Sequence, residues 1–304
     1  MSEAAIPPLE RLLNIQSPSP THLIRPDWPG AENHQITLKR DDLLHPVISG
    51  NKWRKLKYAL LEAQQNQVKQ LISFGGGFSN HLHALAYCCY QMNIRFTAII
   101  RGDYSGNPSP MLRDLVSWGA ELNYVDRLTY QLRDKPEYLA SLQQQYPDGI
   151  IIPEGGSQAL ALKGVGEVIT ELNEDYDYIM APVGSGGTLA GLINTTQSNT
   201  HIMGIAVLKG KGYLESLVSQ LLPAPVKSKS NWHINHHYHL GGYAKTTSEL
   251  NAFCDTFFQQ TAIQIEPVYS GKLFFALRDL IEKHVFPQGS RILVLHTGGL
   301  QGAR

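Results

Sequence analysis

Short hydrophobic runs stand directly before clusters of glycine at four places in the chain. Their length and apolar character are typical of buried strands, and they cover residues 70–74, 149–153, 178–183 and 292–295. Apolar residues spaced as on one face of a helix fill five longer segments, which cover 51–65, 80–91, 164–173, 188–197 and 272–283. A repeated order of strand, glycine loop and helix predicts an α/β fold with a mostly parallel sheet. In such sheets ligands bind beyond the carboxyl ends of the strands, where these glycines are expected to lie.

The length of the chain favours two lobes. A single hydrophobic core rarely grows beyond about 250 to 300 residues, and this chain has 304. For the glycine loops to converge, we expect a smaller lobe, residues 50–151, to be inserted into a larger lobe formed by residues 1–49 and 152–304.

Charge and composition exclude several classes of function. Basic and acidic residues both number 26, so the formal net charge is zero, and neither nucleic acid nor an anionic membrane is an expected partner. No apolar run approaches the ~18 residues of a membrane helix. The three cysteines, two of them adjacent at Cys88 and Cys89, form no disulfide framework, and the first residues lack the pattern of a secretory signal. We therefore expect a cytoplasmic protein whose partners are small molecules.

A glycine-rich loop between a predicted strand and a predicted helix is a candidate for anion binding. It consists of Gly184, Ser185, Gly186, Gly187 and Thr188. Free backbone N–H groups and the positive end of a helix favour a phosphate there. Leu189 replaces the third glycine of a dinucleotide-binding loop, and no Gly-Lys-Ser/Thr ending of a nucleotide P-loop is present. The loop favours a cofactor phosphate over a nucleotide, and its simpler interpretation is a tight turn without a ligand.

A second glycine turn opens the predicted helix that carries Lys52, Lys55 and Lys57. Positive charge at a helix N-terminus is unfavourable, so a lysine at this place is expected to have the lowered pKa that a Schiff-base lysine needs. The simpler interpretation is a solvated basic face.

Three consecutive glycines, 75–77, precede Ser79, Asn80 and His81 at the start of another predicted helix. Ser79 or Asn80 can cap that helix. Three glycines exceed what one cap requires, and the surplus favours the close approach of a flat ring or a carboxylate to the backbone.

Three further polar residues stand within two residues of a glycine: Tyr243, Tyr269 and Thr297. Each tyrosine is either an acid or base or a packing residue, and Thr297 is either a ligand of the site or a satisfied strand end. The histidine-rich segment 233–239 contains no carboxylate or cysteine to complete a metal site, so no metal is expected.

The order of these motifs resembles that of the aminocyclopropanecarboxylate deaminase and D-cysteine desulfhydrase family. The shared motifs, from about residue 36 to the last residues, are Gly-Asn-Lys-x-Arg-Lys-Leu, Gly-Gly-x-x-Ser-Asn-His, Gly-Ser-Gly-Gly-Thr, Val-Tyr-x-Gly-Lys and His-Thr-Gly-Gly. These are pyridoxal-phosphate enzymes of the tryptophan-synthase β-like fold. The resemblance therefore implies two three-layer lobes with mostly parallel twisted sheets, pyridoxal 5'-phosphate as the cofactor, and a homodimer.

The resemblance also implies a role for each matching residue. Lys52, rather than Lys55 or Lys57, would form the Schiff base with the cofactor. Asn80 would bond to the cofactor's phenolic oxygen, Thr297 would face its pyridine nitrogen, and the loop 184–188 would hold its phosphate. The implied substrate contacts are Ser79, Asn80, His81, Gly155, Gly156, Ser157, Tyr243 and Tyr269.

The implied reaction is an α,β-elimination from a small amino acid. The freed amine of Lys52 would remove the α-proton, Tyr269 or Tyr243 would protonate the departing sulfur, and D-cysteine would yield pyruvate, sulfide and ammonia. A hydroxyl at Thr297 does not force protonation of the pyridine nitrogen as a carboxylate would, which favours elimination over racemisation.

Departures from the family pattern decide among related activities. The deaminases carry a glutamate directly after the tyrosine of Val-Tyr-x-Gly-Lys, a leucine at the place of Thr297 and a glutamine at that of His81, whereas this chain has Ser270 after Tyr269. D-Cysteine desulfhydration is the preferred prediction. The alternatives are aminocyclopropanecarboxylate deamination, β-replacement, and a pyridoxal-phosphate carrier without turnover.

Overall fold

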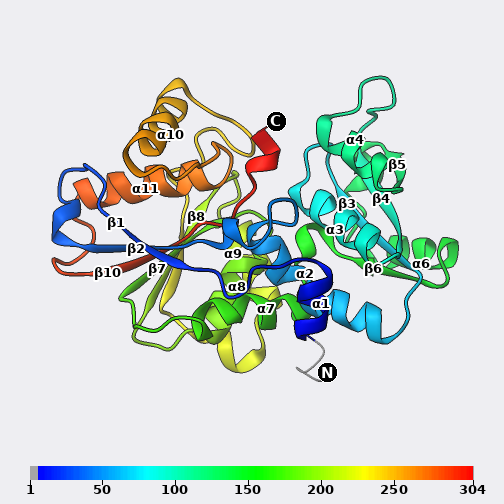
Figure 1. Ribbon diagram of the computed structural model, residues 1–304, viewed down its shortest axis with the longest axis horizontal. Helices are drawn as coiled ribbons and strands as arrows, with labels where there is room; N and C mark the ends of the chain where they lie inside the picture. The colour runs from blue at the N-terminus through cyan, green and yellow to red at the C-terminus, as the bar shows by residue number, and fades with distance from the viewer. Residues whose placement is uncertain (1–5, 304) are drawn as a thin grey trace.

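The computed structural model describes residues 6–303 and contains two β-sheets that lie side by side (Figure 1). Within these residues every neighbouring pair of strands is parallel, except the pair at one edge of the larger sheet. The larger sheet has the order β1 (Thr21–Ile24), β2 (Gln35–Lys39), β10 (Arg291–Leu295), β7 (Tyr178–Val183), β8 (His201–Ala206), β9 (Trp232–Asn235). The smaller sheet has the order β5 (Glu121–Val125), β4 (Arg95–Arg101), β3 (Gln70–Gly75), β6 (Gly149–Ile152).

Helices cover both faces of the larger sheet. One face packs against α10 (Ser248–Thr261) and α11 (Ser270–Glu282), and the other against α7 (Ala159–Thr170), α8 (Gly187–Thr195) and α9 (Tyr213–Leu221). Successive residues of one strand therefore enter opposite cores: Ile292 faces α10 and α11, whereas Leu293 faces α7 to α9. Both faces are buried, which explains why these strands are continuous hydrophobic runs.

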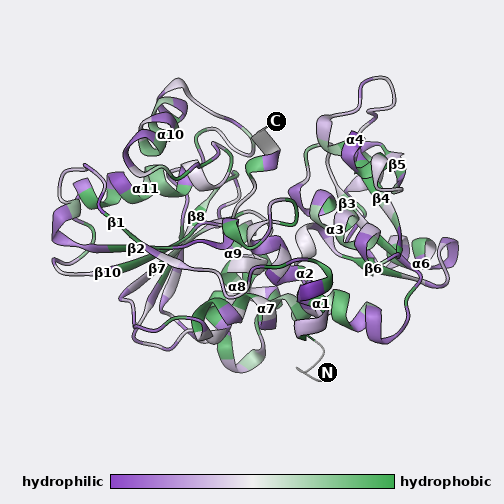
Figure 2. Cartoon of the chain, in the orientation of Figure 1, coloured by the Kyte–Doolittle hydropathy of each residue, from purple (hydrophilic) through white to green (hydrophobic). Residues whose placement is uncertain are grey.

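The smaller sheet has the same three layers. One face packs against α3 (Asn80–Gln91) and α4 (Pro110–Ser117), and the other against α5 (Arg127–Tyr130) and α6 (Pro136–Gln145). The α/β class with parallel sheets, predicted from the alternation of strand and helix, is confirmed. Hydrophobic residues recur along the helices at helical spacing. Figure 2 shows hydrophobic and hydrophilic residues interleaved on α10 and α11, and α10 buries Leu250, Phe253 and Phe257.

Two helices remain near the boundary of the sheets. Helix α2 (Gly50–Gln65) contacts α7 beside the larger sheet and α3 beside the smaller one, and α1 (Ile6–Leu12) buries Leu9 in the same core as α2. The strands of the smaller sheet come from residues 70–152, and those of the larger sheet from segments on both sides of that range. The lobe boundaries at residues 50 and 152 stay a prediction, because α2 packs against helices of both sheets.

One predicted helix is wrong at its start. The segment 164–173 was expected to open at a glycine, but α7 begins five residues earlier and contains Gly164 and Gly166 in its interior. A Cβ at Gly164 would overlap the carbonyl of Arg54 in α2, and one at Gly166 would overlap the hydroxyl of Thr195 in α8. These glycines permit close helix packing rather than marking a helix end.

None of the helices within residues 6–303 is both long enough and apolar enough to cross a membrane.

Candidate active site

A cavity of about 1180 Å³ lies at the carboxyl ends of strands from both sheets. Twelve of the residues predicted for the site line it: Lys52, Ser79, Asn80, His81, Gly155, Ser157, Gly184, Ser185, Gly186, Thr188, Tyr243 and Tyr269. Gly156, Gly187 and Thr297 lie behind this lining. Segments from six parts of the sequence therefore meet here, as expected for the switch region of parallel sheets.

The first turn of α2 is held by the loop that follows β10. Gly50 has a φ of +47° and a Cβ there would overlap the carbonyl of Thr297, which accepts a hydrogen bond of 3.2 Å from Asn51 N. Further along the helix, buried Arg54 bonds to Asp41 at 2.7 Å. These contacts fix the position from which Lys52 enters the cavity.

Lys52 is half-buried, and its Nζ donates a hydrogen bond of 2.8 Å to Asn51 Oδ1. The amine lies 6.0 Å from the centre of the Tyr269 ring. Burial lowers the pKa of Lys52 to about 8, with the charge of Glu266 acting weakly in the opposite direction. A substantial fraction of this amine is therefore neutral near physiological pH. A lowered pKa was expected from the position of Lys52 at the helix N-terminus, but burial is its main cause.

Lys55 is the site residue that the sequence analysis assigned no role. It is buried one turn after Lys52, and its Nζ donates hydrogen bonds to Ser157 Oγ at 2.8 Å and Ser185 Oγ at 3.1 Å. A Cβ at Gly187 would lie 3.0 Å from this amine. The signal that could have found Lys55 is its spacing of three residues from Lys52, because side chains three apart share one face of a helix.

The glycine loop, residues 184–188, lies at the start of α8. Gly186, in the left-handed conformation, is the N-cap residue and supplies no side-chain cap to the first N–H groups of the helix. Thr188 Oγ1 accepts a hydrogen bond of 2.9 Å from Asn51 Nδ2, which ties the loop to α2. Free N–H groups at a positive helix end, with Lys55 beside them, are suited to a phosphate.

The loop before α3 contains three predicted site residues. Ser79 caps the helix, since its Oγ accepts a hydrogen bond of 3.2 Å from Leu82 N. Asn80 Nδ2 donates a long hydrogen bond of 3.4 Å to Gly299 O, and its buried Oδ1 has no partner among residues 6–303. Asn80 thus presents an unpaired polar group at the cavity.

His81 is buried and neutral. Ser73 Oγ donates to Ile152 O at 2.7 Å, so it must accept from His81 Nε2, also at 2.7 Å. His81 Nδ1 is then a bare acceptor, and no partner for it exists in the described part of the chain. Burial first, and then the charges of Lys55 and Lys52, hold the pKa of His81 well below its ordinary value.

Two tyrosines meet at the side of the cavity near Lys52. Tyr269 OH donates to Tyr243 OH at 3.2 Å, and the rings meet edge to face with centroids 5.9 Å apart. Burial raises the pKa of both hydroxyls. Both therefore keep their protons at neutral pH.

Lys272, from the Val-Tyr-x-Gly-Lys motif, holds the backbone next to this tyrosine pair. Its buried Nζ donates to three backbone carbonyls, those of Val207 at 3.1 Å, His239 at 2.9 Å and Gly242 at 2.7 Å. Lys272 thereby fixes the loop that ends in Tyr243.

Glu266 is a second site residue that the sequence analysis missed. Its buried carboxylate lines the cavity and accepts hydrogen bonds from the backbone N–H groups of Val268, Tyr269 and Ser270 at 2.7 to 2.8 Å. Ser270 Oγ donates to the same carboxylate at 3.1 Å. Burial raises the pKa of Glu266 to about 7, against these hydrogen bonds, which lower it. A lone glutamate in a loop carries no sequence pattern that would have revealed it.

The histidine-rich segment makes other contacts. His236 Nε2 lies 2.7 Å from Glu215 Oε1, and His233 Nδ1 lies 2.8 Å from His201 Nε2. Within residues 6–303 no group of three or more His, Cys, Asp or Glu side chains is arranged to hold a metal ion.

Comparison with known proteins identifies the family of this protein. The family model described as "Pyridoxal-phosphate dependent enzyme" matches residues 16–298. The chain belongs to that family. Its cofactor is pyridoxal phosphate, as the resemblance implied, and the protein is an enzyme rather than a nucleotide-binding protein.

Relatives place it in the deaminase and desulfhydrase branch of the pyridoxal-phosphate enzymes. The chain is 29% identical over 283 residues to a putative 1-aminocyclopropane-1-carboxylate deaminase of Pyrococcus horikoshii, covering 88% of this chain and 85% of that protein. It is 30% identical to the bifunctional D-cysteine desulfhydrase/1-aminocyclopropane-1-carboxylate deaminase of Arabidopsis thaliana, covering 93% and 77%. The crystal structure of an ACC deaminase homologue superposes with a TM-score of 0.76 at 27% identity, covering 97% and 96%. The predicted family is confirmed.

The residues present fit the cofactor. The uncapped start of α8 with Lys55 beside it can hold the phosphate, the unpaired Oδ1 and the amide of Asn80 offer polar contacts, and the amine of Lys52 has the lowered pKa that a Schiff base requires. The role of Thr297 toward the pyridine nitrogen, the homodimer and the cytoplasmic location stay predictions.

Proposed function

We propose that this protein is a D-cysteine desulfhydrase, which converts D-cysteine and water to pyruvate, ammonia and hydrogen sulfide. The relatives carry the names of both family activities, so the choice between them depends on this chain's own residues. The choice of D-cysteine desulfhydration depends on the residues that surround Tyr269. A hydroxyl partner, Tyr243, faces it in the cavity, and a serine follows it in the sequence.

Ser270 is the residue that separates the two activities in the family pattern. The deaminases have a glutamate at this position, directly after the tyrosine. Here Ser270 is buried, and its hydroxyl donates to Glu266 rather than reaching the cavity. The position after Tyr269 therefore supplies no acid or base, which favours elimination over ring opening.

Lys52 is the proposed base. Pyridoxal phosphate, when bound, supplies an electron sink for the charge that develops at the substrate's α-carbon. The pKa of about 8 leaves Nζ of Lys52 able both to accept the α-proton and to hold it near neutral pH. Asn51 Oδ1, at 2.8 Å, orients this amine in the cavity.

The tyrosine pair is the proposed donor toward the departing sulfur. Because burial raises the pKa of both hydroxyls, Tyr269 and Tyr243 hold their protons and can donate a hydrogen bond as negative charge develops on the leaving group. The centre of the Tyr269 ring lies 6.0 Å from the Lys52 amine, so the proposed base and the proposed proton donor stand at the same side of the cavity.

Other residues of the cavity are proposed to hold the cofactor and the substrate carboxylate. Lys55 and the loop from Gly184 to Thr188 hold the phosphate, Asn80 contacts the ring side of the cofactor, and the glycines before Ser79 leave backbone accessible to the substrate carboxylate. This division keeps the anion-binding amine, Lys55, apart from the reactive amine, Lys52.

Aminocyclopropanecarboxylate deamination is the alternative, and one observation favours it. Glu266 lines the cavity, and a pKa of about 7 allows it to hold or release a proton at neutral pH. It contacts Ser270, so a carboxylate lies near the position where the deaminases carry theirs. Ring opening would then give 2-oxobutyrate and ammonia.

Product identity tests the proposal. The purified holoenzyme is given D-cysteine, L-cysteine or 1-aminocyclopropane-1-carboxylate, and sulfide, pyruvate and 2-oxobutyrate are measured. We expect D-cysteine to be consumed at least tenfold faster than the other two, with equal amounts of sulfide and pyruvate. A faster release of 2-oxobutyrate would reject the proposal in favour of the alternative.

A further inference from the structure

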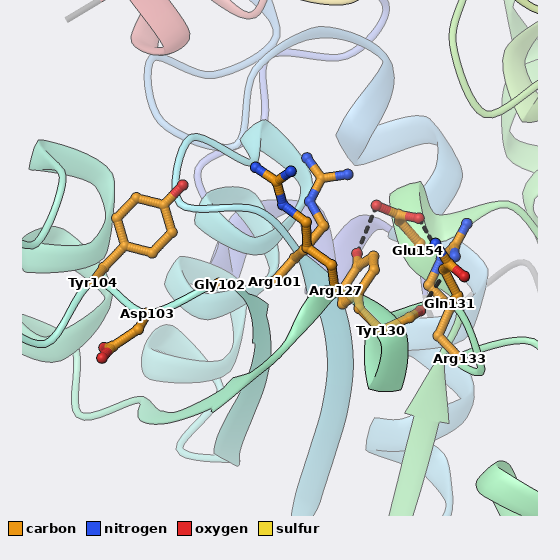
Figure 3. A pocket seen from close by; sticks show the side chains of 9 residues that line it. All are labelled: Arg101, Gly102, Asp103, Tyr104, Arg127, Tyr130, Gln131, Arg133 and Glu154. Carbon is orange, nitrogen blue, oxygen red and sulfur yellow. Dashed lines mark hydrogen bonds and ion pairs between the residues drawn. The ribbon is translucent and has the colours of Figure 1, made fainter.

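A cluster of arginines lies at the outer end of the active-site cavity, in the smaller sheet's half of the molecule. Arg101, the last residue of β4, lines both the cavity and an adjoining pocket of about 770 Å³. Arg127, at the start of α5, and Arg133 line the same pocket (Figure 3). Tyr104, Arg133 and Glu154 also belong to both linings, so the two spaces are continuous.

Only one of the three arginines is neutralised. Arg133 Nε donates to Glu154 Oε2 at 2.6 Å, and Arg133 also pairs with Asp134 at 3.6 Å. The other oxygen of Glu154 accepts from Tyr130 OH at 2.6 Å. Both carboxylate oxygens of Glu154 are therefore used, and Arg101 and Arg127 have no ion pair within residues 6–303. In Figure 3 the two unpaired guanidinium groups point the same way, whereas the carboxylate of Asp103 points away from them.

Arg101 is held in place by an aromatic ring rather than by an acid. Its Cζ lies 5.6 Å from the centre of the Tyr130 ring, against which Arg133 also packs at 5.1 Å. Such stacking orients a guanidinium while leaving its N–H groups free. Nη2 of Arg101 lies 3.6 Å from the place that a Cβ at Gly76 would take. The guanidinium therefore approaches the glycine loop before Ser79 and Asn80.

The field of Arg101 also reaches the reacting side of the cavity. Its positive charge acts to lower the pKa of Tyr243, against the larger effect of burial. An unpaired cation that faces a cavity favours an anion of matching geometry, and a planar guanidinium suits a carboxylate, a sulfonate or a phosphate.

We propose that Arg101 and Arg127 form an anion subsite, which binds a second acidic group carried on the β-substituent of the substrate amino acid. This inference rests on the proposed elimination, and it adds that larger substrates with an acidic leaving group are preferred over neutral ones of the same shape. D-Cysteine is then the smallest substrate, which leaves the subsite unfilled. In the elimination Lys52 takes the α-proton, the Cβ–S bond breaks and its electron pair leaves with sulfur, and a proton from the tyrosine pair gives the acidic thiol. The remaining three-carbon fragment takes up one water to give pyruvate and ammonia.

Matched pairs of substrates test the subsite. S-Carboxymethyl-D-cysteine and S-(2-carboxyethyl)-D-cysteine are each compared with the corresponding amide, which has the same shape without the charge. For the wild-type holoenzyme we expect kcat/KM at least tenfold higher for at least one acid than for its amide. Arg101→Gln should reduce that ratio at least fivefold, and Arg127→Gln should reduce it in the same direction. An acid-to-amide ratio near one in the wild type, or one that neither variant changes, would overturn the proposal.

Two controls separate the possible outcomes. Arg95 is exposed, as Arg101 is, and begins the strand that Arg101 ends, so Arg95→Gln removes the same charge at the far end of β4 and should leave the ratio unchanged.

Binding is measured in parallel from the change in the bound cofactor's absorbance. If no compound is turned over, the proposed elimination fails, while the ratio of acid to amide affinities still decides the subsite. Inhibition by inorganic sulfate is also measured at constant ionic strength. Inhibition by sulfate without any preference for the acidic substrates would show that the subsite binds free anions rather than an acidic group of the substrate.

Discussion

Lys52 and Lys55 enter the cavity from the same face of α2, one turn apart, yet their amines have different surroundings. The Lys52 amine bonds to Asn51 Oδ1 at 2.8 Å, whereas the Lys55 amine bonds to two serine hydroxyls at 2.8 and 3.1 Å. Neither forms an ion pair within residues 6–303. Burial lowers the pKa of Lys55, and the charge of Lys52 lowers it further. Placing two amines so close is costly without an anion, and a phosphate beside Lys55 relieves that cost.

Replacing the two lysines should separate their roles. Lys52→Ala should reduce turnover by roughly 10² to 10⁴-fold, because a positioned base is lost, and should prevent borohydride from fixing pyridoxal phosphate to the protein. Lys55→Ala should instead weaken cofactor binding by about 10 to 100-fold, because a hydrogen bond from a charged group contributes about 1.5 to 3 kcal/mol. Cofactor affinity is measured by absorbance titration and turnover at saturating cofactor. Lys69→Ala, at an exposed position, is the control. Equal losses of affinity and turnover in both variants would contradict the division of roles.

The lowered pKa of Lys52 predicts its reactivity. In the cofactor-free protein its amine is protonated below pH 8 and neutral above it, since burial lowers the pKa to about 8. Labelling with an amine reagent should rise about tenfold per pH unit below that value and level off above it. The labelled peptide containing Lys52 is quantified by mass spectrometry over pH 6 to 10. A midpoint near the ordinary lysine value of about 10.4 would show that burial does not act as stated.

Glu266 should make stability depend on pH. Its pKa is raised to about 7 in the folded state, so between about pH 4.5 and 7 the folded protein binds more protons than the unfolded chain. Its contribution to the free energy of unfolding is therefore present at low pH and lost as pH rises through 7, by up to roughly 3 kcal/mol. Glu266→Gln, which does not titrate, should show a smaller loss between pH 5 and 7.5 in urea unfolding. Parallel pH profiles for the wild type and the variant would exclude this effect.

Gly50 is predicted to be irreplaceable at the start of α2. Its φ of +47° disfavours any side chain, and a Cβ would overlap the carbonyl of Thr297. Gly50→Ala should lower the free energy of unfolding by about 2 kcal/mol or more and should also weaken cofactor binding, because the turn that carries Lys52 moves. Gly106→Ala, where a Cβ would meet nothing within 4 Å, is the matched control and should have little effect on either measurement.

Local patterns were enough to predict much of the fold. Hydrophobic runs before glycines correspond to β3, β6, β7 and β10, because strands buried on both faces are apolar throughout. The helix predicted over 80–91 matches α3 residue for residue. The start of α7 was misjudged because a glycine inside a helix and one that ends it look alike in a sequence. Only the contact of Gly164 with the carbonyl of Arg54 distinguishes them.

The sequence by itself determined the fold class and the family, and it predicted the reactive lysine and the glycine loop, since each depends on residues that are neighbours along the chain. The tertiary structure decided which distant residues meet them. Lys55 reaches Ser157 and Ser185, which lie 102 and 130 residues away. Glu266 reaches the cavity from a loop and Arg101 from the end of β4, and neither belongs to a sequence motif. Burial and charge set the chemistry of such residues, and both arise only when separate strands place their carboxyl ends around one cavity.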